Sequence, residues 1–118
     1  MSGRLHIHKY GQGEKDLVAF HGWAGTHTTF APFAEFLPDS QALIAPDMPG
    51  HGSSKMLDPW NWDSMIETLH DELVPRVSTP FTLVGNCSGA VIALMFAMKY
   101  PAIVKRLFLI ETFAFMPW

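Results

Sequence analysis

The chain has 118 residues, a formal net charge of −3 and an apolar content of 48%. This length is enough for one domain with its own core but not for two. Charged residues make up only 16% of the chain, whereas about a quarter is typical of soluble domains, so we expect strands and helices that are covered on both sides. The acidic balance argues against nucleic acid as a partner, because nucleic-acid binding needs a large basic patch.

Neither a membrane span nor a signal peptide is predicted. The longest apolar run, Ala90 to Met98, is too short to cross a bilayer. Met1 to Lys9 alternates polar and apolar residues and does not have the apolar core of a signal peptide. Cys87 is the only cysteine and therefore cannot form an internal disulfide. We expect a cytoplasmic protein, and the sequence indicates no cofactor.

The first half of the chain predicts three strands and one helix. Arg4 to Tyr10 alternates polar and apolar side chains, as an edge strand does. Asp16 to His21 contains four successive apolar residues, which is typical of a strand buried on both faces. Another short strand is expected at Gln41 to Ala45. Before it, a helix is expected to begin at Thr28 or Thr29 and to bury one apolar face, made of Phe30, Phe33, Ala34 and Leu37.

The second half of the chain continues the alternation of helices and strands. An amphipathic helix is expected from Trp62 to near Pro75, a strand at Phe81 to Val84, a buried helix at Ser88 to Tyr100 and a last buried strand at Arg106 to Ile110. This order predicts an α/β fold, a mostly parallel sheet of about five strands with helices on both faces. The last strand is expected to leave an unpaired edge and uncovered apolar surface.

The strongest local motif is Gly85-Asn86-Cys87-Ser88-Gly89, which lies between a predicted strand and a predicted helix. The two glycines let the strand and the helix approach each other closely, so the turn between them can be sharp. Cys87 then lies at the apex of the turn and at a helix N-terminus, where the helix dipole favours a thiolate. The backbone N–H of Ser88 points at any oxyanion that forms there.

This motif resembles the nucleophile elbow of the α/β-hydrolase superfamily, G-x-S-x-G between a strand and a helix, with cysteine in place of serine. Two further stretches are similar to that family. Phe20-His21-Gly22-Trp23 resembles its HG turn, and the segment from Asp47 to Ser54 resembles its D-x-P-G-x-G-x-S loop. The resemblance covers nearly the whole chain but only the first half of a family member. It implies that residues 1–118 form a single truncated domain that lacks the lid and the C-terminal strands.

The resemblance also implies roles for individual residues. Cys87 takes the place of the nucleophile, and Trp23 and Ser88 supply the two backbone N–H groups of the oxyanion hole. Glu111 ends the last predicted strand, where some members place the catalytic acid; the alternative is that it only closes the strand. No histidine follows Cys87, so the general base that the family places after the acid is missing. The substrate side of the site is expected at His21, Gly22, Asn86 and His51.

The sequence allows two interpretations of Cys87. As a thiolate at an elbow it is a nucleophile suited to esters, lactones or thioesters. As a small buried residue it belongs to an elbow that has lost its chemistry. Ser88 does not take over the role, because it lies one residue past the apex and points along the helix. The rate at which iodoacetamide labels the thiol across pH distinguishes the two interpretations.

The remaining histidines and aromatic residues are interpreted structurally. His6 and His8 have the spacing of two ligands on one strand, but no third ligand is evident, so an exposed strand face is favoured and no metal site is expected. His27 and His70 are interpreted as surface residues. Another set of large side chains suggests either an apolar acyl pocket or packing of a helix and the tail: Trp60, Trp62, Phe113, Phe115, Met116 and Trp118.

Three functions from different classes are compatible with these features. The first is hydrolysis of a small-molecule ester, lactone or thioester through an acyl-Cys87 intermediate. The second is acyl transfer, as in the polyhydroxyalkanoate synthases, with the same thiolate and an acceptor other than water. The third is a non-catalytic chain that binds a partner through its unpaired edge, either by self-association or with a complementary C-terminal segment. An ester assay with and without an added acceptor separates the first two, and the size of the isolated chain in solution tests the third.

Overall fold

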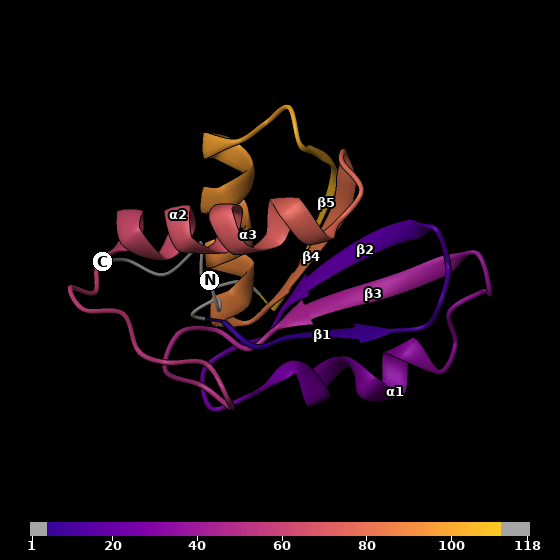
Figure 1. Ribbon diagram of the computed structural model, residues 1–118, viewed down its shortest axis with the longest axis horizontal. Coiled ribbons are helices and arrows are strands. Elements are labelled where there is room, and N and C mark those ends of the chain that lie inside the picture. Colours follow the sequence, from indigo (N-terminus) through magenta and orange to yellow (C-terminus); the bar gives the residue numbers. More distant parts are fainter. Residues whose placement is uncertain (1–4, 112–118) are drawn as a thin grey trace.

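A computed structural model describes residues 5–111 and shows one five-stranded sheet (Figure 1). The strand order is β1-β3-β2-β4-β5. β1 (Ile7–Tyr10) runs antiparallel to β3 (Gln41–Pro46) at one edge. β2 (Lys15–Phe20), β4 (Phe81–Asn86) and β5 (Val104–Ile110) complete the parallel part of the sheet. The predicted class, a mostly parallel five-stranded sheet with helices, is therefore confirmed.

Helices lie on both faces of this sheet, with α1 on one side and α2 and α3 on the other (Figure 1). The α-helices are α1 (Ala31–Ala34), α2 (Trp62–Leu73) and α3 (Ser88–Lys99), and two short 3-10 helices are η1 (His27–Phe30) and η2 (Val74–Arg76). The Asn61 side chain caps α2 by accepting a hydrogen bond of 2.7 Å from the Ser64 backbone N–H, which satisfies one of the free donors of the first turn. Within residues 5–111, none of these helices is long and apolar enough to cross a membrane.

The core has one layer on each side of the sheet, and β2 contributes to both. Val18 and Phe20 pack in the layer beneath α2 and α3, whereas Leu17 and Ala19 belong to the layer that contains Phe30. All four of these β2 side chains are buried. The prediction that the Leu-Val-Ala-Phe run is covered on both faces is confirmed.

The predicted helix after Thr28 is shorter than expected. Its α-helical part is only α1, and Phe33, expected in the core, is 49% exposed. Beyond α1 the backbone winds more tightly than an α-helix. The Phe36 N–H donates to the carbonyl of Phe33, three residues earlier, whereas an α-helix would use the carbonyl four residues earlier. Pro38 follows and has no N–H with which to continue a helix. Phe30 alone of the predicted face is fully buried, while Leu37 packs only partly against the core.

β5 is covered on one face only, so the prediction of a buried last strand holds for that face alone, and the expected uncovered apolar surface lies on the other. Leu107 and Leu109 pack against the core beneath α3. On the opposite face Phe108 is 54% and Ile110 is 46% exposed, because no helix among residues 5–111 covers that face. These two side chains line a groove of about 610 Å³ between β5, β4, β2 and the start of α1, which we call the β5 groove. β5 also forms an edge of the sheet, as expected.

Candidate active site

Cys87 lies at the apex of a sharp turn between β4 and α3. Its backbone has φ 60° and ψ −123°, in the region of positive φ that a residue with a side chain seldom adopts. Two hydrogen bonds hold it there. The Cys87 N–H donates to the Ile110 carbonyl at 2.9 Å, and the Ala90 N–H donates to the Cys87 carbonyl at 3.0 Å. The apex predicted from the glycines of the motif is thus found where the sequence places it.

Close backbone approach around Cys87 requires residues without a Cβ. A Cβ on Gly85 would lie 2.6 Å from the Cα of Ala90 in α3, so the strand and the helix could not keep this separation. A Cβ on Gly22 would lie 2.9 Å from the Cβ of Cys87 itself. The turn after β2 therefore packs directly against the elbow, which brings together the two segments that were expected to form the oxyanion hole.

Trp23 and Ser88, the predicted oxyanion-hole residues, are in direct contact. The Trp23 backbone N–H donates a hydrogen bond of 2.8 Å to the Ser88 hydroxyl oxygen. Ser88 is 7% exposed, whereas the Trp23 side chain projects into solvent. From the sequence only the backbone N–H of Ser88 was expected to take part, so this contact of its side chain was not predicted. One of the two expected donors is therefore already engaged by a hydroxyl group.

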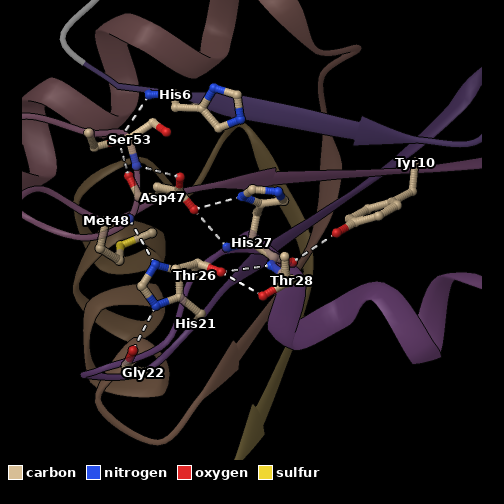
Figure 2. A network of polar contacts seen from close by, with 11 residues as sticks. His6, Tyr10, His21, Gly22, Thr26, His27, Thr28, Asp47, Met48 and Ser53 are labelled. Carbon is tan, nitrogen blue, oxygen red and sulfur yellow. Dashed lines mark hydrogen bonds and ion pairs between the residues drawn. The ribbon is translucent and has the colours of Figure 1, made fainter.

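His21 is buried, and its hydrogen bonds define its tautomer (Figure 2). Its Nε2 accepts a bond of 2.9 Å from the Met48 backbone N–H, so the ring proton lies on Nδ1, which donates to the Gly22 carbonyl at 2.6 Å. Burial, opposed by the bond to Gly22, lowers the pKa of His21. With both nitrogens occupied in the neutral ring, His21 orders the turn that carries Gly22 and Trp23.

Asp47 is a fully buried carboxylate that joins three segments (Figure 2). It accepts hydrogen bonds from the backbone N–H groups of His27 at 2.7 Å and Ser53 at 3.0 Å, and its Oδ1 lies 2.9 Å from the His27 Nδ1. Burial alone would raise the pKa of Asp47, but these bonds outweigh it and lower the pKa. The interpretation of His27 as an ordinary surface residue is therefore wrong.

Several predicted residues meet in one small pocket of about 150 Å³. Its lining includes His21, Gly22, Trp23, His51 and Ser88. The ring centroid of His51 lies 5.2 Å from that of His21, and the His51 Nδ1 lies 3.1 Å from the carbonyl oxygen of the neighbouring Pro49. Apolar side chains complete the lining, and they are Met48, Met56, Trp60, Met65 and Ile92.

Asn86 and Glu111 lie elsewhere, because both line the β5 groove rather than this pocket. Glu111 follows β5 with φ 53°, and Asn86 is paired with Ile110 in the register of β4 and β5. Asn86 and Ser88, the two neighbours of Cys87 in the chain, therefore line different cavities. The tail residues that were interpreted as an acyl pocket or as packing, Phe113, Phe115, Met116 and Trp118, lie outside residues 5–111.

The structure also brings together histidines that the sequence left apart. His6 and His8 were expected to have no third partner, yet His27 joins them, and one ring nitrogen of each lies within 4.8 Å of the others. The expectation fails because His27 is distant in sequence and is positioned by Asp47. His70 instead stacks on Tyr100, with ring centroids 4.1 Å apart.

Comparison with known protein families and relatives agrees with the fold described above. A family model described as alpha/beta hydrolase fold matches residues 17–118. A pimeloyl-(acyl-carrier protein) methyl ester esterase from Legionella pneumophila, strain Corby, is 35% identical over 103 residues, which is 87% of this chain and 40% of the relative. The chain therefore spans less than half the length of this curated relative.

Solved structures show the same fold. Cfl2 from Burkholderia cenocepacia has a TM-score of 0.83 and 29% sequence identity, over 92% of this chain and 37% of that one. A marine microorganism esterase has a TM-score of 0.82 and 27% identity, over 92% of this chain and 41% of that one. In both cases the similarity extends over nearly all of this chain.

Proposed function

The chain belongs to the α/β-hydrolase family, and we propose that it acts in the hydrolysis of carboxylic esters with Cys87 as the nucleophile. The observation that carries the proposal is the backbone of Cys87, held at φ 60° between β4 and α3 with the turn at Gly22 against it. Such strain persists only where the surroundings enforce it, and it is commonly found at functional sites. The esterase relative from Legionella supports the reaction class.

The proposed reaction has two steps. The Cys87 thiolate attacks the ester carbonyl carbon, a C–S bond forms, and the carbonyl electrons move onto oxygen. When they return, the C–O bond to the alcohol breaks, and the leaving alkoxide takes up the proton that the Cys87 thiol lost when it became a thiolate. Water then attacks the acyl-Cys87 thioester, which releases the acid and regenerates the thiol. The reaction as written is a net hydrolysis and consumes no other reagent.

The backbone around the elbow is proposed to stabilise the negative charge on oxygen. The candidate donors are the N–H groups of Trp23 and Ser88. Because the Trp23 N–H is bonded to the Ser88 hydroxyl, the substrate oxygen has to displace that hydroxyl or share the N–H with it. Glu111 remains a candidate for the catalytic acid, because it lies near the elbow on the β5 side. The general base that it would orient has to come from outside residues 5–111.

The pocket beside the elbow is proposed to receive one end of the substrate. His21, Gly22 and His51 line it together with apolar side chains, and a volume of about 150 Å³ suits a small group. Asn86 faces the β5 groove on the other side of Cys87. The name of the Legionella relative, a methyl ester esterase of an acyl chain on a carrier protein, suggests a small alkyl ester as the substrate class.

The test is covalent trapping of the acyl group. The chain is mixed with a nitrophenyl ester, and its intact mass is followed with time, with and without an alcohol acceptor. We expect an adduct of one acyl group that is absent in Cys87→Ala and present in His70→Ala, a variant far from the elbow. Equal labelling of Cys87→Ala would contradict the proposal, and faster loss of the adduct with the alcohol than with water alone would identify acyl transfer instead.

We further propose that the β5 groove is covered in solution by a second copy of the chain or by a complementary C-terminal segment. The proposal is supported by the exposure of Phe108 and Ile110 and by the unpaired edge of β5. Contiguous apolar surface of this kind favours association.

A further inference from the structure

Three histidine side chains gather at the β1 edge of the sheet, at the opposite end from β5. His6 and His8 are two residues apart and therefore project from the same face of the strand segment. His27 begins η1, and its ring lies beside that of His6 (Figure 2). The ring centroid of His27 lies 5.1 Å from that of His6 and 4.8 Å from that of His8. We infer that His6, His8 and His27 form a binding site for a transition-metal dication of the Zn²⁺ class.

The distances suit an ion after small side-chain rotations. One ring nitrogen of each histidine lies within 4.8 Å of the other two. Ligand nitrogens at a tetrahedral zinc ion, with bonds of about 2.0 Å, are about 3.3 Å apart. Neither His6 nor His8 is buried, so their rings can turn to close this difference while His27 stays bonded to Asp47.

His27 already has the second contact that a metal-binding histidine needs. Its Nδ1 lies 2.9 Å from the Asp47 carboxylate, which leaves Nε2 free to face the ion. Its backbone is held as well, since the N–H donates to Asp47 and the carbonyl accepts from the Tyr10 hydroxyl at 3.2 Å. The carboxylate therefore fixes the tautomer and orientation of the ring and supplies one buried negative charge beside a dication.

Stacking alone is the competing explanation for the cluster. The His8 ring stacks on His27 and meets the edge of Tyr10, with centroids 4.4 Å apart. Stacking does not account for the carboxylate behind His27, which is buried and bonded from two segments.

The donor set determines the kind of ion. Imidazole nitrogens suit Zn²⁺, Co²⁺ and Ni²⁺, whereas Mg²⁺ and Ca²⁺ prefer oxygen ligands. Three ligands leave at least one position for water. Because Asp47 also binds the N–H of Ser53, an ion here would brace the loop from Asp47 to Ser54 and raise the thermal stability of the chain.

The test is metal binding to the chain in a Cys87→Ala background, so that the only thiol does not contribute. We expect one Co²⁺ ion to bind per chain and to give visible ligand-field absorption. Zn²⁺ should displace the Co²⁺, and Mg²⁺ should not. His6→Ala and His8→Ala are each expected to weaken Co²⁺ binding by at least about tenfold. His70→Ala is the matched control, because this histidine stacks on Tyr100 away from the cluster, and it should bind as the parent does.

Circular dichroism without metal verifies that each variant is folded. If an alanine variant does not fold, the corresponding glutamine variant, His6→Gln or His8→Gln, is used instead. The inference is overturned if Co²⁺ binds no tighter to the parent than to the His6 and His8 variants. It is also overturned if His70→Ala loses binding to the same extent, since binding would then not depend on this cluster.

Discussion

The hydroxyl oxygen of Ser88 accepts a hydrogen bond of 2.8 Å from the backbone N–H of Trp23, 65 residues earlier in the chain. This bond joins the first residue of α3 to the turn after β2. Ser88 is only 7% exposed, so its end of this hydrogen bond is largely shielded from water. The contact therefore contributes both to the stability of the elbow and to the state of a proposed oxyanion donor.

Ser88→Ala is expected to lower the free energy of unfolding by about 1 kcal/mol, because the Trp23 N–H loses a largely buried acceptor. Urea denaturation measures this change. Ser53→Ala is the matched control, since Ser53 contacts Asp47 through its backbone N–H and keeps that bond. A loss no larger than that of the control would show that water replaces the hydroxyl at no cost.

The same variant is expected to accelerate acylation of Cys87. Without the hydroxyl, the substrate oxygen meets no competing acceptor at the Trp23 N–H. The rate of appearance of the acyl adduct, followed by intact mass, measures the effect. Slower acylation would instead mean that the Ser88 hydroxyl itself donates to the oxyanion.

Gly22→Ala is expected to destabilise the chain by about 1–3 kcal/mol, the usual cost of overpacking. The added Cβ would lie 2.9 Å from the Cβ of Cys87. In a Cys87→Gly background this contact is gone, and the loss should be smaller. In a Cys87→Ala background the Cβ remains and the loss should be unchanged, so the pair of backgrounds isolates the contact. Equal losses in all three backgrounds would place the strain elsewhere.

The sheet and the elbow could be predicted because their signals are local. The apolar run of β2 and the glycines around Cys87 each describe their own surroundings. Uncovered apolar surface at the last strand was expected from the order of the elements, but the face that carries Phe108 could not be identified as the exposed one, because burial of a strand face depends on what lies above it. Periodicity within β5 does not carry that information.

The site was predicted less completely, because its contacts join distant segments. His27 has no local pattern that distinguishes it from a surface residue, and only its bonds to Asp47, 20 residues later, give it a fixed position. The bond between Trp23 and the Ser88 side chain is equally non-local. An aspartate shortly after a predicted strand, at the start of a loop, with histidines elsewhere in the chain, was the one signal available in the sequence.

Stability is expected to fall as the pH drops below about 6.5. The pKa of His21 is lower in the folded chain than its ordinary value of 6.5, so the unfolded chain binds the proton more readily. The contribution of His21 is therefore complete above pH 6.5 and is lost as the pH falls through its folded pKa. Asp47, whose pKa is lowered from 3.8, adds a second loss of the same sign at more acidic pH.

Urea denaturation across this pH range measures the effect, with His21→Gln as the comparison. Glutamine can accept a hydrogen bond but does not titrate, so its stability should depend less steeply on pH between about 7 and 5. Some slope should remain, because the pKa of His8 is also lowered. An unchanged slope would mean that His21 does not control the acid sensitivity.

Substitution of the exposed face of β5 is expected to make the chain more monomeric. Phe108→Lys and Ile110→Lys place a charge in the β5 groove, where burial by a second copy would remove it from water. Sedimentation over a range of concentrations measures the monomer fraction. Phe36→Lys is the matched control, because Phe36 is 85% exposed and does not line the groove. Since scattered apolar residues do not drive association, Phe36→Lys should behave as the parent. If all three variants shift the equilibrium equally, net charge and not the groove governs association.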